Sequence, residues 1–244
     1  MRGLDEDDPR LTALRREIIQ RHAFLHRIYA HWYDSLAAAL PGGPGAVLEL
    51  GSGGGFFAER LPGVLPSEIF YLPCVKVVLD GQQLPFAPAS LRAIVMVDVL
   101  HHLPAVRDFF AEARRCVRPG GVVTMIEPWA TRWSRLIYTR LHKEPFLPEA
   151  PRWEFASSGP LSGANGALPW IVFERDRAIF ESEFPEWEIT GIRAMMPFAY
   201  LVSGGVSMRP LMPGWTWGMW AAFEKLFSSE KWGMFAQVTL RRKD

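Results

Sequence analysis

Cysteine, net charge and long apolar runs are all scarce in this 244-residue chain. The two cysteines, Cys74 and Cys116, are too few for a zinc site and too distant for a CxxC motif, so we expect reduced thiols in a cytoplasmic protein without a metal. With a net charge of only +1, the chain lacks the excess of basic residues that is typical of nucleic-acid-binding proteins. The acidic start MRGLDEDDPR lacks the apolar region of a secretory signal, and no run of about 18 apolar residues occurs, so no membrane span is expected.

The chain is rich in apolar residues, and their spacing predicts the elements. Asp8 and Pro9 are typical of a helix start, and apolar residues then recur on one face as far as Leu36, which predicts an amphipathic helix, broken once at most and ended by PGGPG at 41–45. Short apolar runs then alternate with helical patterns. This alternation predicts a parallel sheet covered on both faces by helices. We expect strands at 46–50, 64–68, 75–79, 91–99, 122–126, 187–195 and 235–243, and helices at about 54–61, 104–117, 133–143 and 172–184.

A knot of glycines in VLELGSGGGFF, residues 47–57, follows the first strand. In an open parallel sheet, such a turn lets the backbone approach a ligand beyond the carboxyl ends of the strands. We expect a nucleotide-like ligand against Gly51, Gly53 and Gly55. The spacing alone does not separate a dinucleotide from a nucleoside.

Acidic residues mark three successive strand ends, at Glu49, Glu68 and Asp80. A carboxylate inside an apolar strand, as Glu49 is, is costly to bury unless a partner satisfies it. Glu68 lies where an acid can accept hydrogen bonds from ribose hydroxyls, and Asp80 could accept from an adenine amine. The three acids suit a ligand with a cationic centre and would repel a pyrophosphate.

Four segments, LELGSGGG, DGQQLPF, IVMVDVLHHL and RPGGVVTMIEP, occur in this order within residues 45–128. Together they closely resemble class I S-adenosylmethionine-dependent methyltransferases, in particular the small-molecule (methyltransferase type 11-like) group. The resemblance implies a Rossmann-like fold of seven mostly parallel strands between helices, with an antiparallel last strand. It also implies that S-adenosylmethionine is the cofactor and S-adenosylhomocysteine the product.

The resemblance assigns roles to positions that match the family's motifs. Glu49 would lie near the methionine amino group, and Glu68 would bind the ribose hydroxyls. Asp80 would bind the adenine amine, with the backbone of Gly81 beside it. The remaining cofactor positions, which form the loop and the methionine side, would be Gly51, Ser52, Gly53, Asp98 and Val99.

Two departures from the family pattern are visible. Only six residues separate Glu68 from the next predicted strand, so the usual intervening helix is missing and the wall of the adenine pocket is altered. Roughly 40 residues, about 195–234, replace the hairpin that commonly joins the last two strands.

Methyl transfer from a sulfonium needs a general base only if the acceptor is a weak acid such as an alcohol. His101 and His102, next to the expected acceptor entrance, are candidate bases, and His142 is a third. Each could instead serve as a helix-end or packing histidine. Glu127, after the fifth strand, and Asn165 and Glu174, in and after a long loop, are candidate substrate contacts. The alternative is that they stabilise the loops in which they lie.

The segment 195–232 is rich in tryptophan and methionine but is interrupted by glycine and proline. Three interpretations stay open: a lid over an apolar acceptor site, a peripheral contact with a membrane interface, or extra core and dimer surface. The oligomeric state is not indicated by the sequence.

We therefore expect an N-terminal helical cap at 1–44 and a methyltransferase domain at 45–244, with insertions at about 130–170 and 195–230. The predicted function is methylation of a small, hydrophobic or aromatic molecule at an oxygen, nitrogen or carbon atom. A catalytically silent binding protein of the same fold and a nicotinamide-dependent oxidoreductase are the alternatives.

Overall fold

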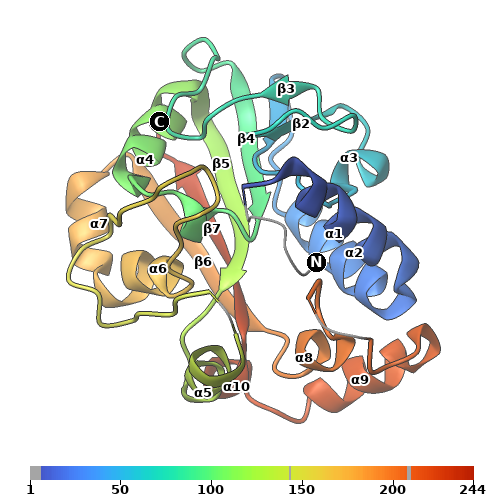
Figure 1. Cartoon of the computed structure of the whole chain (residues 1–244). Helices are drawn as coiled ribbons and strands as arrows, with labels where there is room; N and C mark the ends of the chain where they lie inside the picture. Colours follow the sequence, from blue (N-terminus) through green and yellow to red (C-terminus); the bar gives the residue numbers. More distant parts are fainter. Residues whose placement is uncertain (1–6, 143, 208–209) are drawn as a thin grey trace.

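A computed structural model describes residues 7–142, 144–207 and 210–244, which form a seven-stranded sheet between two layers of helices (Figure 1). The strand order is β3-β2-β1-β4-β5-β7-β6, and β7 alone among these strands runs antiparallel to its neighbours. This is the expected Rossmann-like arrangement. The strands are β1 (Ala46–Glu49), β2 (Val64–Glu68), β3 (Val77–Val78), β4 (Leu91–Val97), β5 (Val117–Pro128), β6 (Trp187–Met195) and β7 (Phe235–Arg242).

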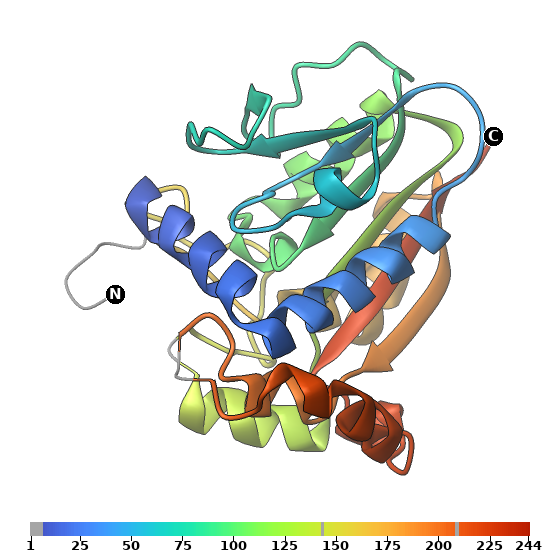
Figure 2. The ribbon, with the colours of Figure 1, turned by 90° about the vertical axis from the view of Figure 1, so that its right-hand side faces the viewer.

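Helices cover both faces of the sheet and one of its ends (Figures 1 and 2). The N-terminal helices lie on one face and α4, α6 and α7 on the other, whereas α5 and α8 to α10 gather near the end at which β5 terminates. The helices are α1 (Pro9–Arg21), α2 (Ala23–Ala38), α3 (Phe57–Arg60), η1 (Leu100–His102), α4 (Val106–Cys116), α5 (Arg132–Leu141), α6 (Leu168–Trp170), η2 (Ile171–Arg175), α7 (Arg177–Glu183), α8 (Ala199–Ser203), η3 (Gly214–Thr216), α9 (Trp217–Glu224) and α10 (Ser229–Trp232).

The predicted N-terminal helix is broken once, at His22, whose backbone is extended. Asp8 caps α1 by accepting a hydrogen bond from the backbone N–H of Arg10 at 2.9 Å. After the break, α2 changes direction (Figure 2). It buries Trp32 against Phe235 of β7, and Tyr33 against Phe56 and Phe57 at the start of α3. The two helices thereby pack over the face of the sheet next to the glycine loop.

One strand and one helix differ from the elements that the sequence predicts. The β5 strand begins at Val117 rather than at 122, because RPGG forms a bulge within it: Leu91 pairs with Val117, and Ala93 already pairs with Val122. The helix expected at 172–184 is divided by a π-helical turn, in which the N–H of Asp176 reaches the carbonyl of Ile171 at 2.8 Å. The missing helix between β2 and β3 is confirmed, since a short turn joins these strands.

None of the helices within the described residues is long and apolar enough to cross a membrane. Cys74 is exposed and Cys116 is buried, and both are free thiols.

The layer formed by α4, η2 and α7 depends on a cluster of phenylalanines around Phe110. Its ring lies 5.0 Å from the ring of Phe180 and 5.4 Å from that of Phe184. Phe110 is fully buried and also contacts Phe109 and Phe173. Aromatic rings at this density supply apolar burial together with edge-to-face contacts.

Replacing Phe110 with alanine should lower the free energy of unfolding by about 3–5 kcal/mol, because a large cavity forms in this cluster. Urea denaturation followed by circular dichroism measures the change. The control is Tyr71→Ala, whose ring is 75% exposed and which should change stability by less than about 0.5 kcal/mol. Equal effects in the two variants would contradict the packing described.

Candidate functional site

The glycine loop between β1 and α3 is fixed by contacts on several sides. Gly51 and Gly53 both have left-handed backbones, with φ of +63° and +48°. A β-carbon at Gly51 would come within 2.5 Å of the Val99 side chain, whereas one at Gly53 would meet no atom closer than 3.5 Å. Gly51 is therefore required by packing against the segment after β4, and Gly53 by its backbone conformation.

The next two glycines accommodate the N-terminal helices. A β-carbon at Gly54 would lie 2.8 Å from the backbone nitrogen of Arg16 in α1, and one at Gly55 would lie 2.2 Å from the hydroxyl of Tyr33. The Arg16 guanidinium also donates to the carbonyl of Gly55. The side of Gly55 on which we expected a ligand thus faces Tyr33. Gly54 and Gly55 therefore allow α1 and α2 to pack against the loop.

Glu68, at the end of β2, holds the loop to the sheet. One carboxylate oxygen accepts the N–H of Gly53 at 2.9 Å and the other accepts the N–H of Ile69 at 2.8 Å. Burial raises the pKa of Glu68, and these two hydrogen bonds oppose the shift. Each oxygen can accept further hydrogen bonds, which is what a pair of ribose hydroxyls requires.

Glu49 and Ser52 form the inner side of the loop. Glu49 accepts a hydrogen bond from the Ser52 hydroxyl at 2.9 Å, and that hydroxyl in turn accepts the N–H of Ser67 at 3.1 Å. Burial raises the pKa of Glu49 to about 7, although the hydrogen bond from Ser52 lowers it. A cation placed beside Glu49 would favour its ionised form.

Asp80 shapes the turn after β3. Its carboxylate accepts the backbone N–H of Gln82 at 2.8 Å, which is an Asx turn. A β-carbon at the neighbouring Gly81 would meet the side chain of Leu50 at 3.0 Å. The turn therefore lies directly over the end of β1, where the resemblance implies adenine.

Asp98 and Val99 follow β4 with an unusual backbone. Asp98 has φ of +56°, a conformation that is strained for a residue with a side chain. Its carboxylate is half-buried and has no hydrogen-bond partner among the described residues. Burial raises the pKa of Asp98 to about 7, and nearby His101 lowers it. Such a group is available to a ligand at this end of the sheet.

Glu127, at the end of β5, organises this region from within the protein. One oxygen accepts the backbone N–H groups of Val99 and Leu100 at 2.8 and 2.7 Å, and the other lies 2.7 Å from Nδ1 of His101. Glu127 is fully buried. The structure thus gives this predicted substrate contact three partners within the chain, and substrate binding by Glu127 stays a prediction.

The two histidines of LHHL have opposite electrostatic environments. Burial alone would lower the pKa of His101, but Glu127 and Glu144 outweigh it and raise the pKa to about 10. Nε2 of His101 lies 3.6 Å from the Glu144 carboxylate. Burial and the charge of His101 lower the pKa of His102 to about 4. At neutral pH, His101 is therefore a cation between two carboxylates, whereas His102 is a neutral imidazole whose Nδ1 lies 3.3 Å from the carbonyl of Gly163.

The other predicted residues lie in more ordinary places. Asn165 is buried and its side chain bonds to the backbone of Leu147 and Ala167, so it holds two loop segments together. Glu174 is exposed on η2. His142 is exposed at the end of α5, where its Nδ1 accepts the N–H of Glu144 at 3.3 Å. Catalytic or substrate roles for these three stay predictions.

Three tyrosines from separate helices, which the sequence analysis did not single out, lie within electrostatic range of Asp98. Tyr29 comes from α2, Tyr138 from α5 and Tyr200 from α8. Burial raises the pKa of all three phenols, and the nearby charge of Asp98 adds to each shift. Tyr138 donates to the carbonyl of Met234 at 2.8 Å. The hydroxyls of Tyr29 and Tyr200 have no such partner in the described part of the chain.

Among the described residues, two groups of side chains have donor atoms close enough for a metal ion: His101 with His102 and Glu144, and Asp98 with His101 and Glu127. His101 belongs to both groups, and its two ring nitrogens already face Glu127 and Glu144. The cluster is explained by this charge pairing, and the expectation of no metal stays a prediction.

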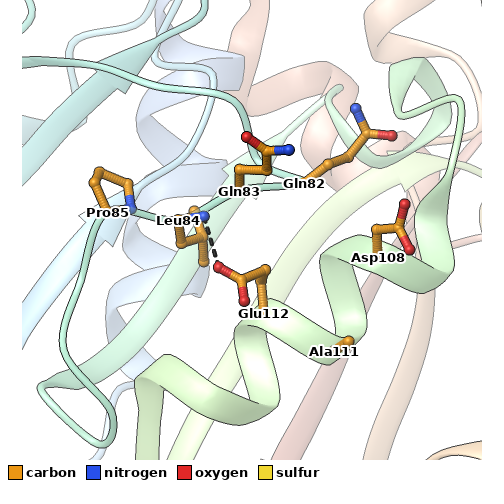
Figure 3. A pocket seen from close by; sticks show the side chains of 7 residues that line it. All are labelled: Gln82, Gln83, Leu84, Pro85, Asp108, Ala111 and Glu112. Atoms are coloured by element: carbon orange, nitrogen blue, oxygen red, sulfur yellow. Dashed lines mark hydrogen bonds between the residues drawn. The ribbon is translucent and has the colours of Figure 1, made fainter.

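A surface pocket of about 570 Å³ lies between the turn after β3 and helix α4 (Figure 3). Two of its polar side chains already have partners: Glu112 accepts the N–H of Leu84 at 2.8 Å, and Gln82 accepts the N–H of Ala105 at 2.9 Å. A second pocket, of about 310 Å³, lies beside Ser35, Arg193 and Gln237. Neither contains the strand-end acids, so both are separate from the candidate site.

Residues 48–125 match the family model described as a methyltransferase domain. Over these residues, the chain carries a methyltransferase domain. The match spans the glycine loop, the turn after β3 and the LHH segment, which are the parts of the structure that form the site. No curated protein matches the chain.

Solved structures similar to the chain share its fold at low identity. A protein from Haloferax volcanii, solved with the Trm112 methyltransferase activator, is 11% identical with a TM-score of 0.56, covering 99% of this chain and 100% of the other. The geranyl diphosphate C-methyltransferase from Streptomyces coelicolor A3(2), solved with Mg²⁺, geranyl diphosphate and S-adenosylhomocysteine, is 14% identical with a TM-score of 0.52, covering 90% and 80%. The [4+2]-cyclase SpnF is 14% identical with a TM-score of 0.51, covering 87% and 80%.

The expected cofactor, S-adenosylmethionine, agrees with the methyltransferase domain and with the donor groups present. Glu68 has free lone pairs where ribose is expected, and Asp98 is an unpartnered acid where a cationic centre is expected. These residues fit the cofactor.

The protonation states of the two histidines can be checked by ¹⁵N NMR of the ring nitrogens. We expect His101 to stay protonated until the pH approaches about 10 and His102 to stay neutral until it falls to about 4. The His142→Gln variant assigns the signal of the exposed His142. Ordinary titration of His101 and His102 near neutrality would contradict the buried charge pair.

Proposed function

We propose that this protein transfers a methyl group from S-adenosylmethionine to a small hydrophobic or aromatic molecule. The observation that carries the proposal is the convergence of Glu49, Glu68, Asp80 and Asp98 around the glycine loop of a matched methyltransferase domain. When bound, the cofactor supplies a methyl group on a sulfonium, which is transferred by in-line displacement.

Different residues of the chain would bind different parts of the cofactor. Glu68 would accept hydrogen bonds from the ribose hydroxyls, and Asp80 with Gly81 would bind the adenine. Glu49 would attract the methionine amino group, because ionisation of its buried carboxyl is favoured by a neighbouring cation. The rest of the cofactor site would be lined by Ser52, Gly53 and Val99. Asp98 would face the cationic sulfur, for which its unpartnered carboxylate is suited.

The acceptor would bind on the other side of Asp98, among Tyr29, Tyr138 and Tyr200. Aromatic walls favour an apolar or aromatic compound, and their ring faces also stabilise a neighbouring cation. The two unpartnered hydroxyls could orient a polar group of the acceptor. Some solved relatives in fold act on small molecules, as the geranyl diphosphate enzyme does, which supports this class of substrate.

If the acceptor is a hydroxyl compound, His102 is the better base of the pair. A base must be unprotonated at working pH, which suits the neutral His102 and not the charged His101. His101 would then be a positioning residue, held by Glu127 and Glu144. His142 lies outside this group, at the exposed end of α5. A cytoplasmic location is part of the same proposal.

Titration calorimetry tests the cofactor assignment. S-adenosylhomocysteine should bind, whereas NADH should not, because the acidic strand ends repel a pyrophosphate. The variants Glu68→Gln and Asp80→Asn should each weaken the affinity by about 1–3 kcal/mol, the value of a hydrogen bond to a charged group. Glu188→Gln, at an exposed position on β6, is the matched control. Binding of NADH, or unchanged affinity in both site variants, would overturn the proposal.

The base can be tested by screening small phenols and alcohols for release of S-adenosylhomocysteine. With a hydroxyl acceptor, His102→Gln should lower kcat by about 100-fold or more while cofactor affinity stays unchanged. His142→Gln should keep the wild-type kcat. A large loss in His142→Gln with none in His102→Gln would reverse the assignment.

A further inference from the structure

Helix α9 has an apolar surface that the rest of the chain does not cover. Its sequence, WGMWAAFE, is apolar on every side, yet none of its residues is buried. The single charged residue, Glu224, turns inward and accepts the N–H groups of Phe198 and Ala199 at 2.8 and 2.6 Å. A helix that is apolar all round is stable in an apolar environment, whereas the chain covers α9 only in part, through Trp217 and Trp220.

The exposed apolar side chains continue from α9 to its neighbours. Ring contacts connect Trp220 with Phe223, Phe223 with Phe227, Phe227 with Trp232 of α10, and Trp232 with Trp133 of α5, at 5.0–5.7 Å. Around this layer lies an outer patch of highly exposed side chains, which we call the apolar patch: Leu136, Leu141, Trp215, Met219, Phe223 and Leu226. Such a gathering is unusual on a monomeric protein, where exposed apolar residues are usually scattered.

The charged residues beside the apolar patch are mostly basic. In α5 and residues 210–232, the exposed charged side chains are Arg132, Arg140, Lys225, Lys231 and Glu230, so four positive and one negative charge give +3. The whole chain has a net charge of only +1. The four basic side chains form no salt bridge with a described residue. The segments that carry the apolar patch therefore have a local excess of positive charge.

We propose that the apolar patch and its basic rim dock the protein on an anionic lipid surface. Tryptophan and leucine enter the boundary between headgroups and acyl chains, while lysine and arginine attract anionic headgroups. A second copy of the chain fits less well, because a twofold contact would bring the two basic rims together.

The location of the patch connects the docking with the proposed function. This connection rests on the proposed function, whereas the docking itself does not. The patch residues lie in α5, in η3 and in and just after α9. Helix α5 also supplies Tyr138, and α8, which packs against α9, supplies Tyr200 (Figure 1). A lipid-soluble acceptor could pass from the bilayer to these tyrosines without crossing water. The acceptor class would then be a membrane-dissolved compound.

Co-sedimentation with vesicles tests the docking. The full-length protein should sediment with vesicles of phosphatidylcholine and phosphatidylglycerol in equal amounts, and much less with pure phosphatidylcholine or at high salt. The double variant Trp215→Ser, Leu226→Ser should lower the partition coefficient at least tenfold, since it removes two large exposed apolar groups. Tyr71→Ser is the matched control: Tyr71 is 75% exposed, like Trp215 at 76%, but lies in the β2–β3 turn, and its removal should have no effect.

Two further measurements separate the outcomes. Calorimetry with S-adenosylhomocysteine, without lipid, should give the same affinity in the double variant, which shows an intact fold and keeps this test apart from that of the cofactor. Sedimentation velocity tests self-association. The proposal is overturned if the wild-type protein does not sediment with anionic vesicles, if the double variant sediments equally well, or if the patch variant abolishes a dimer and no vesicle binding occurs.

Discussion

The carboxylate of Glu68 is the contact on which the rest of the site depends. By accepting the N–H groups of Gly53 and Ile69, it joins the glycine loop to the end of β2. The loop then presents Gly54 and Gly55 to α1 and α2, which pack against its backbone. One buried acid thus sets the position of the loop, and the loop sets the position of the N-terminal helices. The absence of a helix between β2 and β3 leaves this arrangement intact, since Glu68 needs only the first residue of the turn.

Charge is distributed in the site in a way that suits a cationic ligand. Glu49 and Asp98 have pKa values raised to about 7 by burial, so each is poised to ionise when a cation approaches. Of the cationic side chains near these acids, His101 is already balanced by Glu127 and Glu144, and Arg16 pairs with Glu59, so Arg15 is the remaining one among the described residues. The excess of acid therefore remains for a ligand with a positive centre. The fold alone would not establish the function, because the [4+2]-cyclase SpnF has a similar fold.

The strands and the strand-end acids could be predicted because they depend on local patterns. Apolar runs, the glycine loop and the spacing of acids are visible in neighbouring residues. The seven-stranded, mostly parallel sheet, the broken N-terminal helix and the short second crossover are confirmed. The roles of Glu127, Glu144 and the three tyrosines depend on contacts between segments far apart in the chain. No periodicity indicates that Glu144 faces His101, or that Tyr29, Tyr138 and Tyr200 all come within electrostatic range of Asp98. The packing role of Gly54 and Gly55 was missed for the same reason. These glycines accommodate helices that precede them by some twenty to forty residues, and a contact over that distance leaves no local pattern.

The most direct test of the central claim is a crystal structure of the protein with S-adenosylhomocysteine bound. The account predicts that the ribose hydroxyls bond to Glu68, that the adenine lies beside Asp80 and Gly81, and that the sulfur faces Asp98. A crevice that stays vacant at saturating ligand, or a nucleoside bound away from Glu68, would contradict it.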